Sequence, residues 1–150
     1  MSNKIQAIEQ LFQNIVEHFS AGDLDQYFNL FDMPCLLVIE QGNMVVTNKQ
    51  TLQDLFDPIM ARLRAGGYDR SAYTKLSTHL LSPTLAITSM VWNRYRADNS
   101  LLETQGVTYT LKLIDGQWRM VVLHPHEPAT AIQFFSSKQG RAVSNAETDM

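Results

Sequence analysis

The chain has 150 residues and a formal net charge of −3, with 45% hydrophobic and 18% charged residues. A chain of this length and composition is typical of one globular domain with a single hydrophobic core. Its basic residues are scattered along the sequence, which excludes the dense positive surface that nucleic-acid binding requires. No apolar stretch has the length of a signal peptide or a membrane span, so we expect a cytoplasmic protein without membrane contact.

The first 34 residues have the apolar spacing of two helices. Between residues 4 and 21, apolar side chains recur every three or four residues, which predicts a first helix with one apolar face. Gly22 ends this helix, and Asp23 caps a short second helix that we expect to continue to Pro34.

A small hairpin is expected next. Two short apolar runs at 35–39 and 44–47 flank the polar residues 40–43, which have the composition of a tight turn. Cys35 is the one cysteine, so an internal disulfide is excluded. Its apolar neighbours favour a buried, inert thiol over a nucleophile.

A third helix follows the hairpin. Residues 47–50 have the form of a capping box, with Thr47 as the cap and Gln50 three residues later. Pro58 lies inside the helical pattern and is expected to kink or divide the helix. Gly66-Gly67 ends it.

The second half of the chain has the pattern of four strands. The clearest turn is Asp115-Gly116, a preferred two-residue hairpin loop. The middle strands are long, about fourteen residues each, and strands of this length must twist and curl. We therefore predict an α+β fold, a cone of three helices packed on a curved, mostly antiparallel sheet. The four predicted strands are residues 72–81, 84–97, 101–114 and 117–124.

The domain is expected to span residues 1–128, and residues 129–150 form a C-terminal extension. Within the extension, residues 131–135 are predicted either to form one short helix or to pack on the rim of the fold. From about residue 136 the composition becomes polar and predicts disorder.

Three motifs occur in a characteristic order. They are the joint between the first two helices at 22–31, the long third helix ending in Gly-Gly-Tyr at 66–68, and the sequence Asp-Gly-Gln-Trp-Arg-Met at 115–120. Together, over residues 4–126, they resemble the nuclear-transport-factor-2-like (NTF2-like, or SnoaL-like) superfamily. The resemblance implies a cystatin-like roll of helices on a curved antiparallel sheet, and homodimers are common in this superfamily.

The resemblance does not select a chemistry. The superfamily includes ketosteroid isomerases, polyketide cyclases, dehydratases and epoxide hydrolases, and also members that only bind or dimerise. The isomerase site is not carried over to this chain. The first helix has no tyrosine, Glu40 is near the first hairpin without clearly matching the catalytic base, and the late strands offer only Asp98 at their turn.

Strand register divides the sheet into two faces. The loop at 115–116 places Leu113 opposite Trp118, and an uninterrupted register then places Val107 opposite His124. A loop at 98–99 places Arg94 opposite Glu103, and a one-residue bulge would reverse these faces. The face directed at the helices is then predicted to hold Met90, Trp92, Arg94, Glu103, Gln105, Val107, Tyr109, Leu111, Met120, Val122 and His124.

An apolar face with a few convergent polar groups is the usual form of a small-molecule site. His124 is the candidate catalytic acid or base; the alternative is a structural histidine at the end of a strand. The predicted pocket residues are Trp92, Arg94, Glu103, Gln105, Tyr109, His18, Met90 and Met120.

Each of these residues also has a simpler interpretation. Arg94 and Glu103 either polarise a ligand or form a solvated ion pair at the sheet rim. The two tryptophans either pack in the core or stack on a ligand. His18 either enters the cavity or meets solvent. His126 lacks the further ligands that a metal site requires, so we predict no metal and no cofactor.

The favoured function is a pocket protein that binds a small, mostly apolar molecule. Acid–base chemistry of the isomerase, dehydratase or cyclase type around His124 is a further hypothesis. The alternative is a non-catalytic dimerisation or regulatory domain whose own side chains fill the cavity. An open cavity of about 300 Å³ or more would favour the first interpretation.

The opposite, outer face of the sheet is predicted to form a homodimer. Its apolar patch is larger than monomers usually tolerate, and two-fold pairing would bury it on both subunits. The alternative is that the C-terminal segment with Phe134 and Phe135 folds back over the patch. The patch residues are Ile87, Val91, Tyr95, Val121 and Leu123.

Overall fold

The computed structural model describes residues 2–134, and its first element is the expected long helix α1 (Ser2–Ala21). Gly22 adopts a positive φ of 75°, which ends the helix. The Asp23 carboxylate accepts the backbone N–H of Gln26 and caps α2 (Leu24–Phe28), as predicted.

The second helix ends at Phe28, so the prediction that it continues to Pro34 was wrong. Strand pairing takes the chain out of the helix earlier. The carbonyl of Leu30 accepts the N–H of Met120, and Phe31 then pairs with Met120 in parallel. Pro34 therefore lies inside strand β1 (Phe31–Ile39).

The predicted first hairpin is confirmed, with β1 paired to β2 (Gly42–Val46) through a two-residue turn at Glu40-Gln41. The other side of β1 pairs in parallel with the last strand. This pairing joins the hairpin to the rest of the sheet, which the sequence did not indicate.

Helix α3 (Lys49–Ala65) is capped by Asn48, whose side-chain oxygen accepts the N–H of Thr51 at 3.0 Å. The cap is thus one residue later than the predicted Thr47. Pro58 does not divide the helix. It is exposed, so the carbonyl of Asp54, which loses its helical partner, can bond water.

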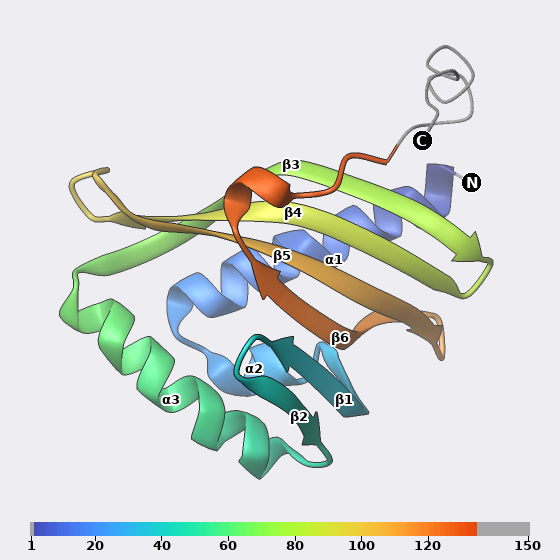
Figure 1. The fold of residues 1–150 in the computed structure, drawn as a ribbon, viewed down its shortest axis with the longest axis horizontal. Coiled ribbons are helices and arrows are strands. Elements are labelled where there is room, and N and C mark those ends of the chain that lie inside the picture. The colour runs from blue at the N-terminus through green and yellow to red at the C-terminus, as the bar shows by residue number, and fades with distance from the viewer. Residues whose placement is uncertain (1, 135–150) are drawn as a thin grey trace.

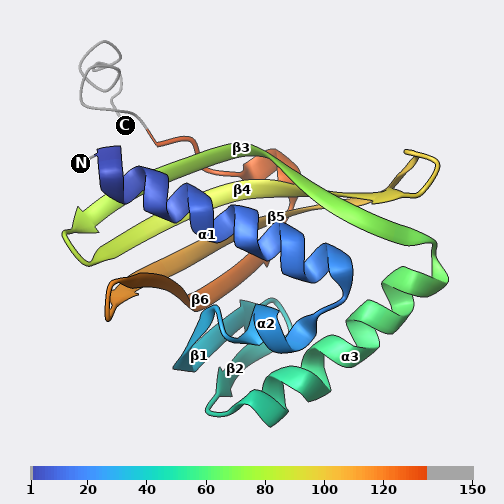
Figure 2. The same ribbon diagram turned by 180° about the vertical axis from the view of Figure 1, so that it is seen from behind.

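The remaining strands complete one six-stranded sheet in the order β2-β1-β6-β5-β4-β3. All neighbours are antiparallel except β1 and β6. The predicted α+β class with a curved, mostly antiparallel sheet is confirmed (Figures 1 and 2). The remaining strands are β3 (Tyr68–Ser82), β4 (Leu85–Arg96), β5 (Leu101–Ile114) and β6 (Gln117–His126).

The two faces of the sheet are covered differently. Helix α1 runs across β3, β4 and β5 on one side, here called the inner face, whereas the short helix η1 (Pro128–Thr130) lies on the opposite, outer face (Figures 1 and 2). Helix α3 extends from the end of β2 to the start of β3. A cone formed by all three helices stays a prediction. No helix among residues 2–134 combines the length and the hydropathy needed to cross a membrane.

The β4–β5 register agrees with the prediction from the Arg94–Glu103 pair onward. Nearer the turn it does not: the loop spans 97–100 instead of 98–99, and a register shift beside Arg94 pairs Tyr95 with Leu101. The β5–β6 register agrees only from the Asp115-Gly116 turn to the Leu111–Met120 pair. A bulge follows, and Thr110 pairs with Val122 instead of Val121. Side-chain facing therefore reverses in the last part of β6.

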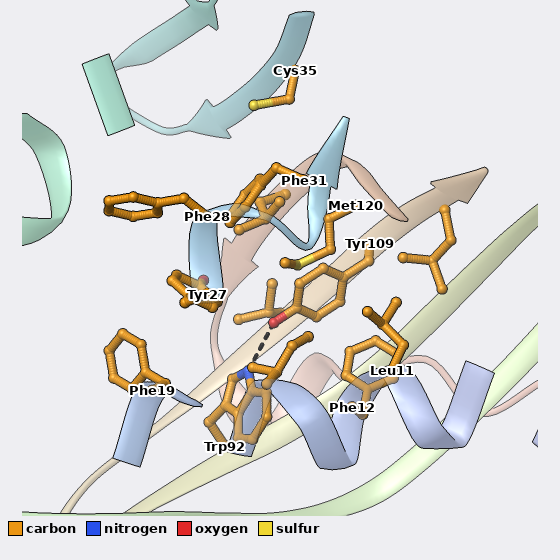
Figure 3. Packing of buried hydrophobic residues seen from close by; sticks show 14 of the residues in the cluster. Leu11, Phe12, Phe19, Tyr27, Phe28, Phe31, Cys35, Trp92, Tyr109 and Met120 are labelled. Carbon is orange, nitrogen blue, oxygen red and sulfur yellow. Dashed lines mark hydrogen bonds between the residues drawn. The ribbon is translucent and has the colours of Figure 1, made fainter. Parts of the chain in front are cut away.

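The inner face packs against the helices through an aromatic cluster (Figure 3). The Tyr27 ring meets three rings edge-on, each with a centroid distance of 5.2 Å: those of Phe19, Phe31 and Phe56. Cys35 is buried, as predicted, and burial raises the pKa of its thiol to about 11.

The segment after β6 crosses the outer face. The N–H of Ile132 donates to Ser89 Oγ on β4 at 2.8 Å, and the N–H of Phe134 donates to Ser77 Oγ on β3 at 2.7 Å. The Phe134 ring stacks on His79 with a centroid distance of 5.8 Å. The C-terminal segment thus folds back over the outer face, as in the stated alternative to the homodimer. The disorder predicted from residue 136 lies outside the described residues.

Candidate functional site

A cavity of about 680 Å³ lies between the inner face of the sheet and the three helices. Helices α1, α2 and α3 and all six strands contribute to its wall, and the apolar side chains come mainly from α1, α3, β1 and the middle of β5. Representative apolar lining residues are Ile15, Phe19, Leu37, Leu55, Phe56 and Val107.

His124 is not part of this wall. The bulge in β6 places it opposite Thr108 on the outer face, where it is exposed, so its predicted inner-face position was wrong. The reversal instead directs Leu123 inwards, where it is 6% exposed and lines the cavity.

His126 follows on the same strand, because β6 continues through Pro125. It is the one histidine that lines the cavity within the described part of the chain. Both of its ring nitrogens already have partners, Thr108 Oγ1 and the carbonyl of Glu127, each at 2.8 Å. Thr108 lies on the outer face, as does His124 two residues earlier, so the His126 ring is held in a structural network on that side and only borders the cavity.

Five of the predicted pocket residues come together on the cavity wall: Trp92, Arg94, Glu103, Gln105 and Tyr109. The other three do not. Met90 and Met120 are fully buried in the core, because they lie farther along the inner face than the cavity extends. His18 is half-buried on α1 and is absent from the wall.

The polar part of the wall is centred on Arg94, whose side chain is 12% exposed. Its Nη1 donates to Glu103 at 2.7 Å and to Gln105 at 3.4 Å. Arg62 of α3 reaches the other oxygen of Glu103 at 3.1 Å. One carboxylate is thus shared by two guanidinium groups, and the guanidinium of Arg94 also lies 5.7 Å from the Phe19 ring centroid.

The charge state of Glu103 follows from these contacts. Its partial burial acts to raise the pKa, but the hydrogen bond from Arg62 and the charge of Arg94 outweigh burial. The net effect holds the pKa of Glu103 below its ordinary value. Glu103 is therefore ionised near neutral pH and fully engaged, so it does not serve as a free base.

Two buried tyrosines, Tyr109 and Tyr27, supply further polar atoms. Tyr109 accepts a 2.8 Å hydrogen bond from the indole N–H of Trp92 (Figure 3). Burial raises the pKa of Tyr109 to about 12. Burial, and then proximity to Tyr109, raise the pKa of Tyr27 well above its ordinary value. Both phenols are therefore neutral and available as hydrogen-bond donors.

Arg62 and Ser71 are among the polar wall residues that sequence reasoning missed. Arg62 follows Ile59 by three positions and Leu55 by seven, so helical spacing alone places it on their face. Ser71 was missed because the strand was predicted to start at residue 72, whereas β3 begins at Tyr68. No group of three or more potential metal-binding side chains occurs among residues 2–134.

The sequence matches a family described as NTF2-like protein (DUF6841) over residues 4–128. The chain belongs to this NTF2-like family. The match confirms the resemblance inferred from the three motifs and covers all of the elements that build the cavity. A search of curated protein sequences gave no match.

Solved structures with the same fold are distant in sequence. An NTF2-like protein of unknown function from Shewanella oneidensis is 20% identical, with a TM-score of 0.66 over 81% of this chain and 98% of that chain. Aln2 from a Streptomyces species is 14% identical, with a TM-score of 0.71 over 85% of this chain and 92% of that chain.

A third structure is a candidate scytalone dehydratase from Novosphingobium aromaticivorans. It is 14% identical, with a TM-score of 0.62 over 91% of this chain and 93% of that chain. At these identities the likeness shows the NTF2-like fold alone.

Proposed function

We propose that this NTF2-like chain is a pocket protein that binds a small, mostly apolar molecule between its helices and the inner face of its sheet. The observation that carries the proposal is the open cavity of about 680 Å³. It is about twice the lower limit of roughly 300 Å³ for small-molecule pockets. A domain used only for dimerisation or regulation has no need to keep such a volume open.

The composition of the wall supports the same function. Apolar side chains from α1, α3 and β5 line most of the cavity, and a few polar groups gather around Arg94. This combination gives affinity through burial of apolar surface and orientation through hydrogen bonds.

Binding is favoured over acid–base catalysis. His124 faces away from the cavity, His126 is engaged through both ring nitrogens, and Glu103 is held by two arginines. A general base requires a free group within hydrogen-bond reach of the substrate. The deep wall offers neutral phenols and a guanidinium instead.

Trp92 provides a direct test, because it lines the cavity and Trp118 does not. In a Trp118→Phe background, the neutral dye N-phenyl-1-naphthylamine should quench Trp92 fluorescence in a saturable manner with one site per chain. A Leu55→Trp substitution fills the cavity and should weaken binding by about tenfold or more.

The matched control is Leu101→Trp, which introduces the same side chain at an exposed position outside the cavity. It should leave dye binding unchanged. Absence of saturable binding, or equal weakening by both substitutions, would contradict the proposal.

A further inference from the structure

We infer that the molecule bound in this cavity carries a carboxylate, and that the unused edge of the Arg94 guanidinium binds it. This inference rests on the proposed function and names the class of its ligand. It is argued from charge, from unpaired donors and from the geometry of the guanidinium.

The polar wall has one positive charge that no neighbouring acid neutralises. Arg62 and Arg94 share the single carboxylate of Glu103, which leaves a net charge of +1 at this cluster. The other acids that line the cavity, Glu40 and Glu127, are exposed, so solvent screens them. Arg94 is 12% exposed against 62% for Arg62, so the share of this excess charge that falls on Arg94 is less screened by solvent and favours an anionic partner.

The hydrogen bonds of Arg94 use only one side of its planar group. Nη1 bonds Glu103 and Gln105, whereas Nε is buried and has no partner. It is the one such buried side-chain atom among residues 3–134, whose side chains the structure describes. An unsatisfied buried donor costs about 1–3 kcal/mol, so Nε is the donor of this guanidinium that still needs an acceptor.

The free side of the guanidinium presents Nε–H and Nη2 side by side. Nη2 makes no hydrogen bond to any residue that the structure describes. Two parallel donors with this spacing match the two oxygens of a carboxylate.

The nearby neutral groups also need acceptors from the ligand. The Tyr109 oxygen already accepts from Trp92, so its O–H is left to donate. The hydroxyl of Tyr27 has no hydrogen bond among the described residues, although it lines the cavity. The polar end of the cavity thus offers donors and a positive charge, which a carboxylate complements.

The test compares two ligands of the same shape, 2-naphthoate and 2-naphthamide, as competitors of N-phenyl-1-naphthylamine. The wild-type chain should bind the carboxylate about tenfold or more tightly than the amide at neutral pH. Arg94→Met should abolish this preference and leave the affinity for the amide within about twofold. Arg62 still pairs with Glu103 in this variant.

Arg70→Gln is the charge-matched control, since it also removes one positive charge but lies outside the cavity wall. It should retain the preference. Arg94→Lys keeps the charge without the second donor edge, so it should reduce the preference several-fold.

The outcomes separate the two proposals. If the dye binds but the wild-type chain binds 2-naphthoate and 2-naphthamide equally, the carboxylate inference is overturned while the pocket function stands. A preference that persists in folded Arg94→Met, or that is undiminished in folded Arg94→Lys, also overturns it. If neither the dye nor either competitor binds, the proposed function itself fails.

Discussion

Trp92 and Tyr109 are joined by a 2.8 Å hydrogen bond from the indole N–H to the phenol oxygen, although they do not face each other in the strand register. Trp92 pairs with Gln105 and Tyr109 with Thr88 across the same two strands. Both side chains are buried on the inner face. The bond fixes the tryptophan ring in the cavity wall. Because the Tyr109 oxygen accepts this bond, its own O–H remains free to donate.

Tyr109→Phe should reduce the free energy of unfolding by about 1–3 kcal/mol, because it leaves the Trp92 N–H buried without an acceptor. The measurement is a denaturant titration of both chains. Tyr73→Phe is the matched control, because the Tyr73 hydroxyl accepts a hydrogen bond only from the exposed Gln13. It should change the free energy of unfolding by less than about 0.5 kcal/mol. Equal losses in the two variants would contradict the role assigned to this bond.

Glu103→Gln should destabilise the chain at neutral pH by about 1–3 kcal/mol, since it removes the charged acceptor shared by Arg62 and Arg94. The folded-state pKa of Glu103 lies below its ordinary value, so the unfolded chain binds its proton more readily. The stabilisation is therefore complete above the unfolded-state pKa and is lost as the pH falls through the folded-state pKa.

The difference in unfolding free energy between wild type and Glu103→Gln should consequently shrink between pH 7 and about pH 3. Titrations at several pH values measure it. Glu17→Gln, at an exposed position of α1, is the control and should differ little from wild type throughout. A difference that grows on acidification would refute the assignment.

Trp118→Ala should reduce the free energy of unfolding by roughly 3–5 kcal/mol, the usual effect of truncating a buried aromatic side chain. Trp118 is buried in the core and pairs with Leu113, as the hairpin loop predicted. Val45→Ala, at an exposed position of β2, should change stability by less than about 0.5 kcal/mol. A loss below about 1 kcal/mol for Trp118→Ala would show that the ring does not support the core.

The inner face could be predicted from sequence as far as turn chemistry fixes the register. Asp115-Gly116 set the β5–β6 pairing as far as the bulge. The pairing of Arg94 with Glu103 was predicted correctly, but the predicted turn was wrong: the loop is 97–100 instead of 98–99, and a register shift beside Arg94 offsets the difference. The bulge at Val121 could not be predicted, because one extra residue in a strand leaves no compositional sign. That single residue moved His124 out of the site.

The cavity itself depends on contacts between distant segments. The parallel pairing of β1 with β6 joins residues about ninety positions apart, beyond any local pattern. The same pairing is irregular between Phe31 and Leu36, where Pro34 has no N–H to donate. Helical spacing could have identified Arg62, but only the packed structure brings it to Glu103.

His124→Ala should leave ligand binding unchanged and alter stability by less than about 0.5 kcal/mol, because the side chain is exposed on the outer face. The measurement is dye binding together with a denaturant titration. Weakened dye binding in a normally stable His124→Ala chain would show that this histidine does reach the ligand.

The predicted homodimer and the C-terminal segment require the same surface. Residues 131–134 cross the outer face and are held to Ser89 and Ser77 by two backbone hydrogen bonds. Val91, part of the predicted dimer patch, is already buried on this face. We therefore expect the segment to compete with dimerisation.

A chain that ends at Pro128 should dimerise at a lower concentration than the full-length chain, because its outer face would expose apolar side chains that a second copy can cover. Sedimentation equilibrium over a concentration series measures this difference. A chain that ends at Phe134 keeps the bonded segment and should behave like the full-length chain.

In the full-length chain, Ser77→Ala with Ser89→Ala removes both hydrogen-bond acceptors and should shift the equilibrium towards the dimer. Monomers at every concentration in all four chains would refute the homodimer, whereas equal dimerisation in all four would show that the segment does not compete for this face.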